Sequence, residues 1–188
     1  MKIKFYFIIL IGLSCYSQNR NSFLSFIASV EHTFISDASL LSFPEISGNL
    51  REENFPNTYS KSLSIGFKAD LNEHVFANLL FGLENFDKPN VNTAPVRFQI
   101  GYNLPWFQNR ISPFGEYNFK TYLGKGTQSG NGFRLGINGV LFKFGQGNKL
   151  SISFFYAGNR VSYGKLENPN ELYKLDFNGL GIGLGLVF

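Results

Sequence analysis

Apolar and polar residues alternate along most of the chain beyond residue 22. In residues 96–104, for example, apolar side chains occupy every second position, and Arg97, Gln99, Gly101 and Asn103 fall between them. Successive side chains of a β-strand point to opposite faces of the sheet. The pattern therefore predicts strands that have one apolar and one polar face.

The alternation recurs in eight segments, at residues 23–34, 59–71, 75–83, 96–104, 111–123, 133–141, 149–156 and 180–188. The connections alternate in length: they are short at 72–74, 105–110 and 145–148, and longer and polar at 35–58, 85–95, 124–131 and 160–172. Strands of roughly ten residues in an even number, with short turns at one end and long loops at the other, are typical of membrane barrels. We therefore predict an all-β fold, an eight-stranded antiparallel up-and-down transmembrane β-barrel.

A soluble β-sandwich or lipocalin-like barrel would also show alternation, but with its apolar face turned inward. Three features favour an apolar face turned toward lipid. The chain has an export leader, aromatic residues at strand ends such as Trp106 and Phe107, and an amphipathic C-terminal segment. The mean hydropathy of −0.05 fits apolar residues that are dispersed along the chain rather than massed.

The N-terminus has the three parts of a secretory leader. Lys2 and Lys4 precede an uncharged apolar run at 5–13, and small residues follow at Cys15 and Ser17. We predict a signal peptide at residues 1–17 and a barrel domain at residues 18–188. Cys15 is alternatively a lipid-attachment site, although Gly12 stands where such a motif normally has Leu.

The composition leaves few kinds of chemistry open. The predicted mature chain has 17 − 2 = 15 Lys and Arg residues against 13 Asp and Glu residues, because two lysines lie in the leader. It has no run of Lys or Arg, so no nucleic-acid partner is expected. Cleavage after Ser17 would also remove Cys15, the one cysteine. His32 and His74 are far apart in sequence and do not make a metal site. We predict no cofactor, and no catalytic, cofactor-binding or metal-binding residues.

The last nine residues carry a pattern with a specific meaning for such proteins. They end on an aromatic residue with apolar residues at every second position before it, namely Leu180, Ile182, Leu184, Leu186 and Phe188. This segment resembles the C-terminal signal that the barrel-assembly machinery recognises, and a free amphipathic edge strand is suited to such pairing. By strand pattern, the whole predicted mature chain resembles the small outer-membrane barrels of the OmpA/OmpX type. The resemblance implies a monomer surrounded by outer-membrane lipids, and the leader ending in Tyr-Ser-Gln resembles those of Bacteroidetes outer-membrane proteins.

If the apolar face contacts lipid, the opposite face lines the interior. That face carries a predicted charge network of Glu31, Glu84, Arg97, Glu116, Lys120 and Arg134, together with Lys68, Asp70 and Lys149. Eight strands enclose only enough space for side chains, so we expect paired charges that plug the barrel. A conducting or ligand-binding interior is the alternative.

The last strand places glycines on its inner face at positions 179, 181, 183 and 185. Either long Arg and Lys side chains from other strands cover this wall, which we favour, or a groove is left there. The apolar parity also changes between Phe177 and Leu180, which predicts a bulge near Asn178 and Gly179.

The pattern favours a structural or surface-interaction role through the long loops. The segment 35–58 is unusually apolar for a loop and is expected to fold over the barrel mouth or bind a partner. A narrow channel for small solutes is the second hypothesis. The third is a lipid A-modifying enzyme, because residues 154–159 and 168–171 resemble the lipid A 3-O-deacylase family. The His and Ser of that family are absent here, so an enzyme is not expected.

Overall fold

The computed structural model describes residues 24–43, 51–54, 57–88, 90–123, 129–145, 147–164 and 172–188. Their strands are β1 (Leu24–Phe43), β2 (Arg51–Asn54), β3 (Thr58–Asp70), β4 (Val75–Phe86), β5 (Val91–Tyr102), β6 (Ile111–Tyr122), β7 (Ser129–Phe144), β8 (Asn148–Gly164) and β9 (Leu172–Val187). One 3-10 turn, η1 (Pro105–Phe107), connects β5 to β6. Among these residues no helix is long and apolar enough to cross a membrane.

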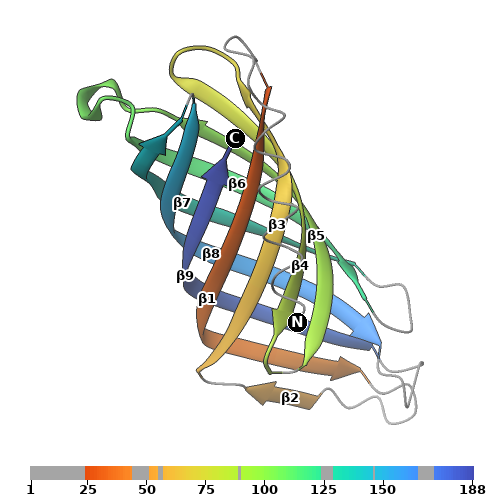
Figure 1. Ribbon diagram of the computed structural model, residues 1–188. Helices are drawn as coiled ribbons and strands as arrows, with labels where there is room; N and C mark the ends of the chain where they lie inside the picture. Colours follow the sequence, from red (N-terminus) through yellow and green to blue (C-terminus); the bar gives the residue numbers. More distant parts are fainter. Residues whose placement is uncertain are drawn as a thin grey trace, which may run out of the picture.

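The strands form one closed antiparallel wall (Figure 1). β1 pairs with β3, each later strand pairs with the next, and β9 returns to pair with β1. The short strand β2 pairs with residues 39–42 of β1, along the same edge as β3, and so extends the wall without adding to its circumference. The described residues therefore form an eight-stranded up-and-down barrel, and the fold prediction is confirmed.

One end of the barrel, here called the turn end, holds the start of β1, the end of β9 and three short turns. Phe26 and Phe188 exchange two backbone hydrogen bonds of 3.2 and 2.9 Å there, so pairing continues to the last residue. In the β3–β4 turn the Asn72 side-chain oxygen accepts the backbone N–H groups of His74 and Val75. Gly145 and Gly147, both at positive φ, form the β7–β8 turn. The opposite end, the loop end, carries β2 and the remaining connections (Figure 1).

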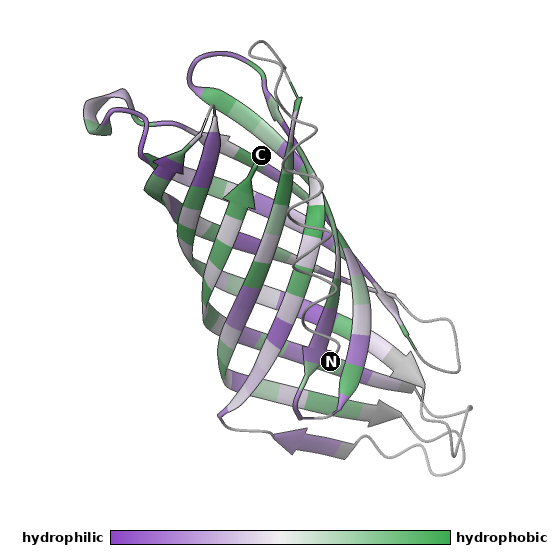
Figure 2. Cartoon of the chain, in the orientation of Figure 1, coloured by the Kyte–Doolittle hydropathy of each residue, from purple (hydrophilic) through white to green (hydrophobic). Residues whose placement is uncertain are grey.

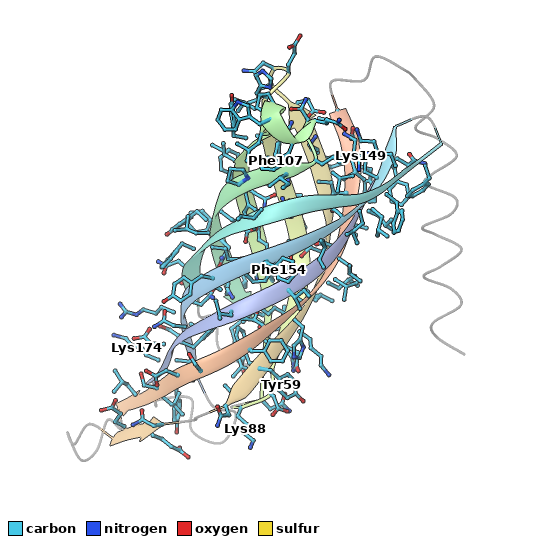
Figure 3. All side chains as sticks on the ribbon, turned by 90° about the vertical axis from the view of Figure 1, so that its left-hand side faces the viewer. Tyr59, Lys88, Phe107, Lys149, Phe154 and Lys174 are labelled. Carbon is cyan, nitrogen blue, oxygen red and sulfur yellow. The ribbon has the colours of Figure 1, made fainter. Side chains whose placement is uncertain are left out.

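An apolar belt covers the outside of the wall. Large apolar side chains on all eight strands of the wall are exposed there, including Leu24, Val30, Ile65, Phe81, Ile100, Phe119, Leu135, Phe154 and Leu180. Figure 2 shows the resulting alternation along each strand, and Figure 3 labels Phe154 of the belt, whose surface is 56% accessible. The inner face holds charged and polar side chains that are buried. A closed sheet with this belt satisfies its backbone internally and suits hydrocarbon, so the soluble alternative is wrong.

The strands run further toward the loop end than the sequence pattern predicted. The segment 35–58, expected to be a loop, contains the last part of β1 and all of β2, and the segment 85–95 contains the ends of β4 and β5. Similarly, β8 continues to Gly164. Beyond the belt the inner face becomes apolar and the outer face polar, so the sequence pattern used to recognise strands is reversed.

The predicted bulge lies on the neighbouring strand. The register shifts between Ile35 and Asp37 of β1, opposite Gly179 and Asn178 of β9, so Ser36 is the extra residue. β9 keeps a regular alternation across this point. The apolar parity of β9 changes because its buried inner positions at the loop end are themselves apolar. The prediction of a bulge in β9 was therefore wrong.

Cysteines at two exposed turn positions test which end faces outward. Asn90 lies at the loop end and Glu73 at the turn end. Since short turns face the periplasm in barrels of this kind, we expect a membrane-impermeant maleimide to label Asn90→Cys on intact cells. Glu73→Cys should react only after the outer membrane is permeabilised. The unsubstituted chain controls for background, and labelling of Glu73→Cys on intact cells would contradict this orientation.

Candidate functional site

Six charged side chains meet inside the barrel, about halfway along its wall. They come from five strands: Glu31 from β1, Glu84 from β4, Arg97 from β5, Glu116 and Lys120 from β6, and Arg134 from β7. Each lies on the inner face because strand parity turns its apolar neighbours toward lipid. The structure thus brings together all six residues of the predicted charge network.

Glu31 links the two arginines. Its Oε2 accepts a hydrogen bond of 2.6 Å from Nη1 of Arg97 and another from Nη1 of Arg134. The Ser62 hydroxyl donates to the same oxygen at 2.9 Å. Glu116, directly opposite Arg134 in the β6–β7 register, lies 3.8 Å from Nε of Arg97 and 3.6 Å from Nε of Arg134. Each of these carboxylates therefore contacts both guanidinium groups.

Glu84 and Lys120 form the part of the network nearest the loop end. The Lys120 ammonium donates to Oε2 of Glu84, and the Ser60 hydroxyl donates to Oε1 at 3.1 Å. Nη2 of Arg134 lies 3.6 Å from the same Oε1 atom and connects this pair to the rest. The network then contains three carboxylates and three cations, so its formal charge is zero. Balanced pairing is the condition under which charges can be buried in a low-dielectric interior.

An apolar cluster fills the barrel on the loop-end side of the charges. We call it the outer apolar cluster: Ile35, Ala38, Leu40, Phe86, Val91, Val161, Tyr173, Leu175 and Phe177. Lys120 joins it to the charge network, since its ammonium lies 5.0 Å from the Phe86 ring centre and 5.4 Å from that of Phe177. The interior is therefore filled by two successive layers, one ionic and one apolar.

On the turn-end side the interior is more open. A cavity of about 420 Å³ extends from the turn residues Asn72 and Gln108 to Glu31, Glu116 and Arg134 at its floor. Its walls mix amides and hydroxyls with rings, among them Asn78, Gln99, Ser112, Phe76, Phe114 and Phe155. Lys68, paired with Asp70, and Lys149 also line it. The cavity is thus closed at its inner end by the charge network.

The glycine wall of β9 leaves no groove beside the charge network. A Cβ added at Gly181 would come within 2.2 Å of the Phe155 ring, and one at Gly183 within 2.5 Å of the Ser153 hydroxyl and 2.9 Å of Cγ of Glu31. The Phe155 ring in turn carries the Arg134 guanidinium 4.6 Å from its centre. The wall is packed, as predicted, but Phe155, Ser153 and Glu31 cover it rather than the long Lys and Arg side chains that we expected.

The remaining predicted residues lie on the outside or beyond the described part of the chain. Leu180, Ile182 and Leu184 face outward, while Phe188 is buried and its ring lies 6.3 Å from that of Phe26. Trp106 and Phe107 are exposed in η1, with 83% of the Trp106 surface accessible. No group of three or more His, Cys, Asp or Glu side chains suited to a metal occurs among the described residues. The signal peptide with Cys15, and the segment 168–171, lie outside those residues.

Two parts of the interior were missed by reasoning from the sequence. The outer apolar cluster was missed, although apolar residues at Tyr173, Leu175 and Phe177 share the parity of the β9 glycines. That shared parity is the pattern that could have placed them inside. The roles of Ser60 and Ser62 as partners of buried carboxylates depend on the β3 register and have no local pattern.

No protein-family model matches the sequence, and no curated protein does either. Among solved structures, the chain is similar to Neisserial surface protein A, with 14% identity, a TM-score of 0.44 and coverage of 86% of this chain and 96% of the other. It is also similar to the outer membrane protein AlkL, with 15% identity, a TM-score of 0.46 and coverage of 87% and 90%. For OmpT of Vibrio cholerae the identity is 10%, the TM-score 0.31 and the coverage 88% and 52%.

The assignment to a membrane rests on the barrel itself. A closed antiparallel wall of eight strands, an apolar belt on its outside and charges inside are together the features of an outer-membrane barrel. The chain is therefore an outer-membrane β-barrel protein surrounded by membrane lipid.

Removing one arginine from the network should destabilise the barrel strongly. Arg97 is fully buried, so Arg97→Ala leaves Glu31 and Glu116 with one guanidinium fewer, at a cost on the order of 3–5 kcal/mol. We expect a clearly lower urea midpoint for unfolding from lipid vesicles. Arg160→Ala is the matched control, because Arg160 forms an exposed pair with Asp176 outside the barrel. Equal midpoints for the two variants would show that the network is solvated.

The C-terminal residue should matter more for assembly than other exposed aromatics do. Phe188→Asp removes the terminal aromatic and its contact with Phe26, so we expect secretion but a loss of most folded protein from the outer membrane. Phe107→Asp, in the exposed turn η1, should assemble normally. Heat-modifiable mobility on gels of outer-membrane fractions measures the folded amount. Normal levels of Phe188→Asp would contradict a role of this residue in assembly.

Proposed function

We propose that this protein is a sealed outer-membrane barrel that has a structural or surface-interaction role, carried by the loops at its loop end. The observation that supports this most strongly is the double filling of the interior, by the charge network and then by the outer apolar cluster. A channel for small solutes would need a polar path past both layers. In the described residues, Lys120 is held between Glu84 and two aromatic rings at the position such a path would have to cross.

At the loop end the strands extend beyond the apolar belt and carry the loops. β1, β8 and β9 continue past the apolar belt, and β2 adds to β1 there. The outer face of this extension is polar, and Nε and Nη2 of Arg160 donate to the two carboxylate oxygens of Asp176 at 2.6 and 2.9 Å. Apolar inside and polar outside is the arrangement of a water-exposed sheet. Residues 44–50 and 165–171 connect the strands of this extension.

Two other hypotheses have less support. The cavity on the turn-end side stops at the charge network, which does not favour conduction. An enzyme resembling the lipid A deacylases would need an imidazole and a hydroxyl beside β8, where that family has them. Here residues 154–159, Phe-Phe-Tyr-Ala-Gly-Asn, contain neither His nor Ser. We also propose that the barrel is a monomer and that the barrel-assembly machinery inserts it by way of β9.

Planar-bilayer recording on the purified barrel tests the seal. We expect no steady conductance from the native protein, because both layers are closed by side-chain packing. Lys120→Ala, which removes the contact between the layers, should give brief openings. A steady ion-selective current from the native protein would overturn the sealed barrel and favour the channel.

Replacing one loop tests where the surface role lies. In a strain lacking the gene, the native chain is compared with a chain whose residues 165–171 are exchanged for a Gly-Ser linker of equal length. Both should fold and reach the surface, but only the native chain should restore surface properties such as cell aggregation and adhesion. Full restoration by the loop-exchanged chain would contradict a role for this loop.

A further inference from the structure

We propose that the outer wall carries a binding site for the phosphate of a phosphorylated outer-leaflet glycolipid. The site consists of Lys61 of β3, Lys88 of the β4–β5 turn and His32 of β1. It faces lipid rather than the interior, and it is independent of the sealed lumen and of the loops described above.

The height of Lys61 on the wall places it at the lipid headgroups. Ten residue steps separate it from Leu71 at the turn end, which is about 33 Å along a strand at ~3.3 Å per residue. With the usual tilt of about 40°, this becomes about 25 Å along the barrel axis, the height of the apolar band in such barrels. The next outward-facing residue toward the turn end is Leu63, an exposed belt residue. The Lys61 ammonium therefore stands at the outer limit of the hydrocarbon layer.

Two of the three basic side chains are held by one aromatic ring. Lys61 and His32 are directly opposite each other in the β1–β3 register. The His32 ring stacks on Tyr59 with 5.3 Å between ring centres, and Nζ of Lys61 lies 5.1 Å from the centre of the same ring. The Tyr59 hydroxyl is itself hydrogen-bonded to Asp87. Such preorganisation lowers the entropy lost when a ligand binds.

Lys88 is brought to the same place by the β4–β5 turn. Its backbone N–H donates to Oγ1 of Thr58 at 3.1 Å, and the Thr58 hydroxyl is 3.4 Å from the Lys88 carbonyl oxygen. This contact fixes the turn beside the start of β3. Tyr59 and Lys88 accordingly lie close together at the loop end in Figure 3. The Lys88 side chain is exposed, which leaves its ammonium available to a ligand.

Three basic side chains and one acid make up the patch, and the acids Asp37, Glu52 and Glu53 lie further along β1 and β2, beyond it. Asp87, the acid in contact with the patch, is hydrogen-bonded to Tyr59, so Lys61 and Lys88 leave a net charge of +1 before His32 is counted. Elsewhere at the loop end, Arg160 forms an ion pair with Asp176, and Lys174 also interacts with other residues. Outward positions of comparable height on β4 to β7 are neutral: Asn85, Asn92, Thr121 and Asn131.

The chemistry of the patch selects a lipid phosphate. Lysine binds phosphate as a point charge, and aromatic residues such as Tyr59 and Phe34 prefer the membrane interface. The loop end faces the cell exterior in barrels of this kind. A phosphorylated glycolipid of the outer leaflet would place its phosphate on the lysines and its acyl chains along the belt below Lys61.

Lipid binding to the purified barrel tests this site. The barrel is placed in nanodiscs of neutral phosphatidylcholine that contain either bisphosphorylated lipid A or its dephosphorylated form, and retained lipid is measured by native mass spectrometry. We expect preferential retention of the phosphorylated form. Each of K61Q and K88Q should weaken retention about fivefold, and the double variant more. K143Q, an exposed lysine near the turn end, is the control and should retain lipid as the native protein does.

Three outcomes would overturn the proposal. They are equal retention of the dephosphorylated lipid, unchanged retention by the K61Q/K88Q double variant, and binding of inorganic phosphate as tight as that of the lipid. The last would show a site for the free ion. Heat-modifiable gel mobility checks that each variant is folded. If the double variant does not fold, the two single variants test the proposal.

Discussion

Charges in the packed middle of this barrel must be paired with one another, because lipid surrounds the wall and the side chains there leave little room for water. Six charged side chains meet that requirement with three carboxylates and three cations, arranged so that Glu31 and Glu116 each contact both arginines. The requirement extends to smaller residues. Ser60 and Ser62 occupy inner positions of β3 where their hydroxyls complete the coordination of Glu84 and Glu31.

The change from membrane to water along the barrel axis accounts for the rest of the architecture. Within the belt the apolar face is outside and the charges are inside. Past the belt the two faces exchange roles, and Leu175 and Phe177 point inward where glycines occupy the same face of β9 deeper in the barrel. The bulge at Ser36 lies close to this transition and changes the parity of β1, so that Ala38 and Leu40 also turn inward. Lys120 stands at the boundary, with its ammonium on Glu84 and two rings beside it.

The sequence was sufficient for the fold and for the membership of the charge network because both depend on period-two alternation. That period assigns Arg97 and Arg134 to the inner face whatever the register. It was not sufficient where the environment changes along one strand. The change of apolar parity between Phe177 and Leu180 was interpreted as a bulge near Asn178 and Gly179 because an apolar parity was assumed to face lipid throughout. Partners within the network, such as Ser62 with Glu31, depend on strand register and shear, which no local pattern specifies.

The claim that the interior is held by dry, paired charges is tested most directly by the coupling free energy between Glu84 and Lys120. A double-mutant cycle with Glu84→Gln and Lys120→Met, measured by urea unfolding in lipid vesicles, isolates that energy. Both side chains are only 1% exposed. We predict a coupling of about 1.5 kcal/mol or more that changes little between about 0.1 M and 1 M salt, where the Debye length falls from about 10 to 3 Å. A coupling below about 0.5 kcal/mol, or one that salt removes, would contradict the dry network.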